Sequence, residues 1–251
     1  MRRTGCPARV LRCTGFTLLE LLLTVSLIVL LIGLLLPSLN RVRQAGLDAK
    51  SLANVRTHVL SMTMYASDSN GSYLDFISPS ADYGVIRWGQ YVQKIVYFQQ
   101  PNYWHFAMAK KYYGGQIASN TFCVPGSPPG ACTTPDHLGM AGYWYSASFL
   151  AVPEYWNRRT REGRFQWRGM RADQVLFPSA KGLFIGGWPM LYADAAPDWR
   201  IGSDVGFVDG HSDRVTPSEL LPLESGGDGQ YYEMSIPVLH TKDGVRGRDV
   251  R

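Results

Sequence analysis

Two residues near the C-terminus, Asp209 and His211, are of the types that catalytic and metal sites use. They flank Gly210 and follow Phe207 closely in the sequence. A carboxylate beside an imidazole can orient a general base or bind a metal ion. The same sequence also predicts a tight hairpin, because Asp-Gly is a preferred turn pair and Phe207 would be buried beside it. We favour the turn.

The remaining histidines form no cluster with the spacing of metal ligands: His58, His105, His137 and His240. Four acids in the C-terminal third could line a calcium-binding loop: Asp194, Asp198, Asp204 and Asp209. Their spacing does not match a known calcium motif. The sequence therefore predicts no catalytic residue, no metal site and no cofactor, with calcium as the open alternative.

The four cysteines fall into two pairs. Cys6 and Cys13 lie in the first 15 residues, whereas Cys123 and Cys132 lie close together in a stretch rich in Gly and Pro. Neither pair has the C-x2-C spacing of a zinc site. If the first pair is removed with a leader, Cys123 and Cys132 remain, and we expect them to form the single disulfide of an exported domain. Two free thiols in a loop are the alternative.

A single acid, Glu20, lies in the apolar run of residues 16–36, which Pro37 follows. A helix of these 21 residues would span roughly 31 Å, about the thickness of a bilayer core. A secretory signal peptide would have a shorter apolar region and would end in small residues, which are absent here. A carboxylate within a span costs about 2.5–3.5 kcal/mol, so Glu20 is a functional candidate.

Much of the positive charge precedes this run. Residues 1–15 contain four arginines and no acid, and so account for four of the five net positive charges. The basic character of the chain therefore belongs to a leader, and we expect no nucleic-acid partner.

The segment Gly15-Phe16-Thr17-Leu18-Leu19-Glu20 resembles the processing site of type IV prepilins and type II secretion pseudopilins. In that family a short basic leader ends in glycine, phenylalanine follows, and glutamate is the fifth residue of the mature chain. Pro37 is the twenty-second residue counted from Phe16, where the family often has a helix-bending proline.

The resemblance implies a role for each of these residues. A membrane peptidase would cleave between Gly15 and Phe16 and methylate the new Phe16 amine. Glu20 would then pair with the Phe16 amine of a neighbouring subunit during assembly. The implied partners are the prepilin peptidase/methyltransferase, other pilin-like subunits, inner-membrane assembly machinery and membrane lipid. The precursor would lie in a bacterial inner membrane with its head in the periplasm, and later in a periplasmic or cell-surface filament.

Beyond Pro37, apolar residues recur every three or four positions up to residue 66, which predicts that an amphipathic helix continues over residues 37–70. Asp68-Ser69-Asn70-Gly71 supplies turn residues that end it. Residues 64–71 also resemble the "MYAxDxNG" segment of a prepilin-like subfamily.

Residues 71–251 carry short apolar runs broken by Gly and Pro, which predict strands near residues 91–98, 142–145, 182–185 and 205–208. A brief helix is expected near 105–113. The fold class is therefore α+β: a long N-terminal helix packed on a head with an antiparallel sheet. The stretch ending in Asp209-Gly210-His211 resembles the subfamily's C-terminal element, but Trp199 stands where the subfamily has a histidine.

Four segments are thus expected: a leader over 1–15, a transmembrane and assembly helix over 16–36, an amphipathic helix over 37–70, and a head over 71–251. The predicted function is that of a structural, non-enzymatic subunit of a type IV pilus-like or type II secretion filament. The alternative is a membrane-anchored binding protein for a glycan or another polymer, which uses the same leader.

Overall fold

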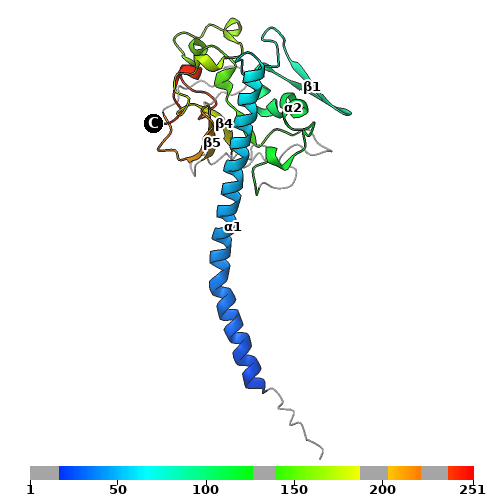
Figure 1. Ribbon diagram of the computed structural model, residues 1–251, viewed down its shortest axis with the longest axis vertical. Helices are drawn as coiled ribbons and strands as arrows, with labels where there is room; N and C mark the ends of the chain where they lie inside the picture. Colours follow the sequence, from blue (N-terminus) through cyan, green and yellow to red (C-terminus); the bar gives the residue numbers. More distant parts are fainter. Residues whose placement is uncertain (1–16, 127–138, 187–202, 222–236) are drawn as a thin grey trace, which may run out of the picture. The chain divides into compact units, whose positions relative to one another are not determined.

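Helix α1, Leu18–Asp68, is the longest element of the chain. The computed structural model describes residues 17–126, 139–186, 203–221 and 237–251, and Figure 1 shows the arrangement of their helices and strands. The contacts divide the chain into two units, residues 1–46 and 47–251, and α1 contributes to both. We refer to residues 18–46 as the outer half of α1 and to residues 47–251 as the head.

The end of α1 follows from the turn residues after it. Asn70 and Gly71 adopt left-handed backbone conformations, with φ of 53° and 80°. The N–H of Gly71 donates to the carbonyl of Ala66 at 2.7 Å, and the N–H of Ser69 donates to the same oxygen at 3.1 Å. These bonds satisfy a carbonyl that the helix itself leaves unpaired. The helix therefore ends where the sequence Asp68-Ser69-Asn70-Gly71 predicts.

The head contains a four-stranded antiparallel sheet in the order β3-β4-β5-β6. Its strands are β3 (Tyr143–Tyr145), β4 (Gly182–Gly186), β5 (Ser203–Phe207) and β6 (Ser212–Val215). A separate hairpin pairs β1 (Gly84–Trp88) with β2 (Tyr91–Ile95). The α+β class, with a long helix packed on an antiparallel sheet, is confirmed.

The region from residue 91 to 112 differs in detail from its prediction. The strand expected over 91–98 is shorter, because β2 ends at Ile95 and the 3₁₀ helix η1, Tyr97–Gln99, follows. Helix α2, Gln100–Tyr112, begins before the predicted 105–113. Pro101 lies in its first turn, where a missing N–H costs nothing.

Six further 3₁₀ helices lie in the described segments: η2 (Asn120–Phe122), η3 (Ala147–Phe149), η4 (Pro153–Trp156), η5 (Arg164–Gln166), η6 (Ala172–Gln174) and η8 (Gly244–Arg246).

Within the head, α1 packs on the sheet because β5 has a glycine at the contact. Val55, Val59 and Met62 of α1 are fully buried. A Cβ atom at Gly206 would overlap Cγ1 of Val55 and Cγ2 of Val59. The absence of a side chain at this position lets the helix approach the strand closely, as β4 and β5 beside α1 in Figure 1 illustrate.

Candidate functional site

The outer half of α1 is an apolar helix whose side chains are all exposed. Large side chains such as Leu18 (87% exposed) and Leu34 (69%) are representative of it. Between Leu18 and Asn40 the only charged residue is Glu20. α1 is long and apolar enough to cross a membrane, which is compatible with membrane anchoring or with a signal sequence.

Thr17 and Glu20 form a capping box at the start of α1. The N–H of Thr17 donates to Oε2 of Glu20 at 2.9 Å, and the N–H of Glu20 donates to Oγ1 of Thr17 at 3.3 Å. The hydroxyl of Thr17 also donates to the same carboxylate oxygen, at 2.8 Å. The pair satisfies N–H groups that no helix can satisfy internally. Glu20 therefore has a local structural role, which the sequence analysis did not identify although the T-x-x-E spacing was available.

The hydroxyl groups of the outer half bond to carbonyls of their own helix. Thr24 donates to Leu21 O at 2.9 Å, and Ser26 donates to Leu22 O at 2.8 Å. Because these donors have partners within the helix, they need no water. Of the polar side chains before Asn40, the carboxylate of Glu20 is therefore the one that carries charge into apolar surroundings.

Pro37 lies inside α1, and the helix continues past it. A proline cannot donate to the carbonyl four residues earlier, and its ring crowds that carbonyl. The residue at that position is Gly33, and a Cβ atom there would meet nothing within 4 Å. Position 33 therefore has room beside the proline.

The apolar face that the sequence predicts from Leu39 onward is buried only in the head. Leu39 and Val42 are exposed, whereas the buried residues of α1 all lie between Ser51 and Ala66. The buried face also contains polar side chains, which a pattern of apolar residues cannot predict. Tyr143 of β3 places its hydroxyl 3.0 Å from the Ser51 hydroxyl, and Asn54 donates to it at 3.4 Å.

His58 is the most enclosed of these polar side chains. Its Nε2 lies 2.8 Å from the carbonyl of Thr121, which can only accept, so Nε2 carries the proton. Its Nδ1 then accepts from the hydroxyl of Tyr113, also at 2.8 Å. Burial lowers the pKa of His58 to about 4, although the Thr121 carbonyl favours the charged form. The ring is therefore neutral at pH 7 and is a part of the core.

Asp209, Gly210 and His211 form the turn between β5 and β6. The N–H of Gly210 donates to Phe207 O at 3.0 Å, and Gly210 has a φ of 98°. The N–H of His211 donates to Oδ1 of Asp209 at 3.2 Å, and Nδ1 of His211 bonds to the same oxygen. The rings of Phe207 and His211 stack with centroids 4.2 Å apart. These contacts give each residue of the turn a structural role.

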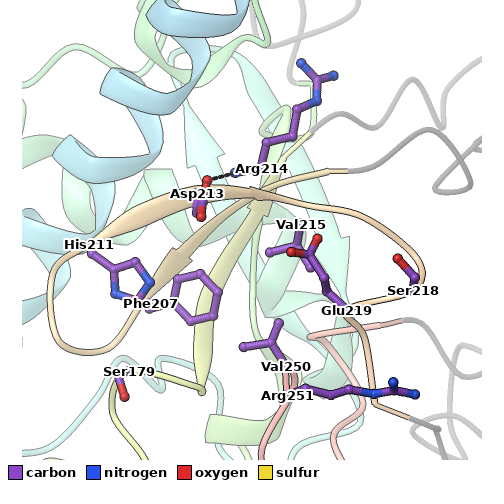
Figure 2. Close-up of a pocket in the computed structure, with 10 residues that line it drawn as sticks. All are labelled: Ser179, Phe207, His211, Asp213, Arg214, Val215, Ser218, Glu219, Val250 and Arg251. Atoms are coloured by element: carbon purple, nitrogen blue, oxygen red, sulfur yellow. Dashed lines mark hydrogen bonds between the residues drawn. The ribbon is translucent and has the colours of Figure 1, made fainter.

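The turn borders an open pocket of about 490 Å³, which Figure 2 shows. Its lining is Ser179, Phe207, His211, Asp213, Arg214, Val215, Ser218, Glu219, Val250 and Arg251. Among the described residues neither serine hydroxyl bonds to His211, so the nucleophile–base contact of a hydrolase is not formed there. Arg214, which also lines the pocket, forms an ion pair with Asp48 of α1 at 2.8 Å.

Of the predicted calcium ligands, Asp194 and Asp198 lie outside the described residues. Asp209 is in the turn, and Asp204 is a buried residue of β5. In the described part of the chain, no group of three His, Cys, Asp or Glu side chains could hold a metal ion.

Cys123 is disulfide-bonded. Cys132 lies outside the described residues, so the pairing of Cys123 with Cys132 stays a prediction, as do the roles of Gly15 and Phe16.

A buried ion pair that the sequence did not reveal holds the C-terminal segment in the head. Lys181 Nζ lies 2.9 Å from Oδ2 of Asp249, and both side chains are almost completely buried. The N–H of Gly182 donates to the same oxygen at 2.8 Å, and Thr241 bonds to both members of the pair. Burial lowers the pKa of Lys181, while the nearby Asp249 opposes that shift. No local spacing could predict this contact, because 68 residues separate its partners.

Comparison with known proteins does not identify a family. A scan against protein-family models finds no match, and searches of curated proteins and of solved structures find none either.

Proposed function

We propose that this protein is a pilin-like structural subunit that is cleaved after Gly15 and assembles through the outer half of α1. The observation that carries the proposal is the exposed apolar helix with one carboxylate at its start. A folded protein that works as a single chain has no reason to leave about five turns of leucine-rich helix exposed. A membrane before assembly and neighbouring subunits after it would cover this surface.

Glu20 is then the residue with two successive partners. In the isolated chain its carboxylate caps the helix through Thr17. In a filament, the free amine of Phe16 on a neighbouring subunit would supply the opposite charge. An unpaired charge in apolar surroundings is costly, so this pairing would fix the axial position of one subunit against the next. The proposal makes the protein structural and not enzymatic.

The head would lie outside the inner membrane, as the disulfide at Cys123 favours. The second candidate is a membrane-anchored binding protein with the same leader, which would stay unassembled. The open pocket beside His211 is the observation that keeps this candidate under consideration.

The experiment that tests the proposal is an intact-mass measurement on protein isolated from its native host. We expect a mature chain that begins at an N-methylated Phe16 and therefore lacks Cys6 and Cys13. A mature chain that begins at Met1 would contradict the proposal. So would a chain that begins near Ser38, because a signal peptidase would then have removed most of the outer half of α1, including Glu20.

A further inference from the structure

The segment between η4 and η6 has the strongest local concentration of positive charge in the head. Between Arg158 and Arg171 it has six arginines, no lysine and one acid, Glu162. The arginines are Arg158, Arg159, Arg161, Arg164, Arg168 and Arg171. The charge of the whole chain conceals this segment, because acids elsewhere in the head offset it. We refer to residues 158–171 as the arginine segment.

The arginine segment has a fixed backbone although it is mostly irregular. The side chain of Gln166 is buried, and its Oε1 accepts from the N–H groups of Glu162 at 2.8 Å and Gly163 at 3.3 Å. Its Nε2 donates to the carbonyl of Thr160 at 2.8 Å. One amide thus ties three backbone groups of the loop together. A binding surface on such a loop pays less entropy when a ligand docks.

The arginine segment has both buried and exposed side chains. Trp167 is 7% exposed, and its ring stacks on Tyr97 with centroids 5.2 Å apart. Phe165, two residues earlier, is 70% exposed. Arg164 and Arg168 on either side of it are also exposed. Gln166 and Trp167 thus anchor this stretch in the core, while Phe165, Arg164 and Arg168 beside them in the sequence are exposed to solvent.

Arg161 donates to the carbonyl of Tyr155 at 2.8 Å, so it is held against the head. Two other arginines form long, exposed ion pairs: Arg164 with Asp82 at 3.5 Å, and Arg171 with Asp173 at 3.3 Å. Exposed pairs of this kind contribute little free energy, so a stronger anion can replace the acid. In the described part of the chain, no acid lies within ion-pair distance of Arg159 or Arg168.

We propose that the arginine segment is a binding surface for single-stranded nucleic acid. The guanidinium groups match phosphate oxygens in a bidentate geometry. Exposed Phe165 offers a face on which an unpaired base can stack, which is how proteins bind single strands without sequence preference. A sulfated polysaccharide could also bind the arginines, but it has no aromatic base to stack on the ring of Phe165. The proposal is independent of the assembly role of α1, and it revises the expectation of no nucleic-acid partner.

The test is fluorescence anisotropy of a labelled oligo-dT strand with the full chain in non-ionic detergent micelles. Two triple variants remove the same charge. The first is R159Q/R164Q/R168Q, and the control is R87Q/K94Q/K110Q on the exposed surface of other elements. Both keep the leader, so its arginines contribute equally. Phe165→Ala tests the stacking contact, and heparin is the competing sulfated polysaccharide.

We expect the arginine triple variant to lower affinity more than the control and to reduce the slope of log K against log salt by about 2. Phe165→Ala should lower affinity on the order of tenfold and leave that slope unchanged. Equal effects of the two triple variants would overturn the proposal. So would heparin binding more tightly than oligo-dT together with no effect of Phe165→Ala, because the surface would then favour sulfated polysaccharide. Tryptophan fluorescence of each variant checks that the head remains folded.

Discussion

The outer half of α1 and the head satisfy their polar groups in opposite ways. In the outer half, hydroxyls and the Glu20 carboxylate bond within four residues along the chain. In the head, buried groups such as Lys181 and His58 bond to distant segments, at Asp249 and Thr121 respectively. The apolar side chains differ as well, since many of those in the head are buried against one another and those of the outer half are exposed. The apolar surface of the head is thus covered within the chain, whereas that of the outer half is available to a partner outside the chain.

The largest expected effect on the head alone comes from its buried ion pair. Asp249→Ala would leave the ammonium group of Lys181 buried without its partner, and we expect a loss of about 3–5 kcal/mol in the free energy of unfolding. All seven tryptophans follow residue 71, so denaturation followed by tryptophan fluorescence reports on the head. Asp68→Ala is the control, because its ion pair with Lys111 is exposed and should give no measurable loss. Comparable losses for the two variants would mean that the Lys181–Asp249 pair does not hold the C-terminal segment.

A smaller effect, which compares the two regions directly, comes from one methyl group added at a glycine of each. Gly206→Ala would place a Cβ against Val55 and Val59, and we expect a loss of about 1–3 kcal/mol from the head. Gly33→Ala meets nothing within 4 Å and should leave the unfolding of the head unchanged. The same fluorescence measurement applies to both. A loss of head stability in Gly33→Ala would show that the outer half contributes to the head, and the contrast between the regions would fail.

Local sequence signals predicted the elements whose causes are themselves local. The apolar run, the three-to-four spacing and the residues Asp68 to Gly71 predicted where α1 runs and ends, because helix bonds and caps form between near neighbours. The strands at 142–145, 182–185 and 205–208 were predicted from short apolar runs bounded by glycine. Their order in the sheet was not, because it depends on contacts between distant segments.

The candidate sites were predicted unevenly for the same reason. The turn at Gly210 follows from Asp-Gly, whereas the bond between Lys181 and Asp249 could not be seen in the sequence. The spacing of apolar residues could not predict that polar residues such as Ser51 and His58 lie on the buried face of α1, since their partners come from other elements. The capping box at Thr17 and the arginine segment were visible signals. The former follows from the T-x-x-E spacing of Thr17 and Glu20, and the latter from a local excess of arginine that the net charge of the whole chain does not show.

The central claim, that Glu20 serves assembly through its charge and not through its cap, can be tested with two matched substitutions. Glu20→Gln removes the charge but keeps an oxygen that can accept from the N–H of Thr17. Thr17→Val removes the capping hydroxyl but keeps the charge. The measurement is the ratio of filament sheared from cells to protein retained in the membrane, with tryptophan fluorescence as the check on the head. We expect this ratio to fall at least tenfold in Glu20→Gln and to change little in Thr17→Val, with the head equally stable in both. A normal filament yield from Glu20→Gln, or an equal fall in Thr17→Val, would contradict the claim.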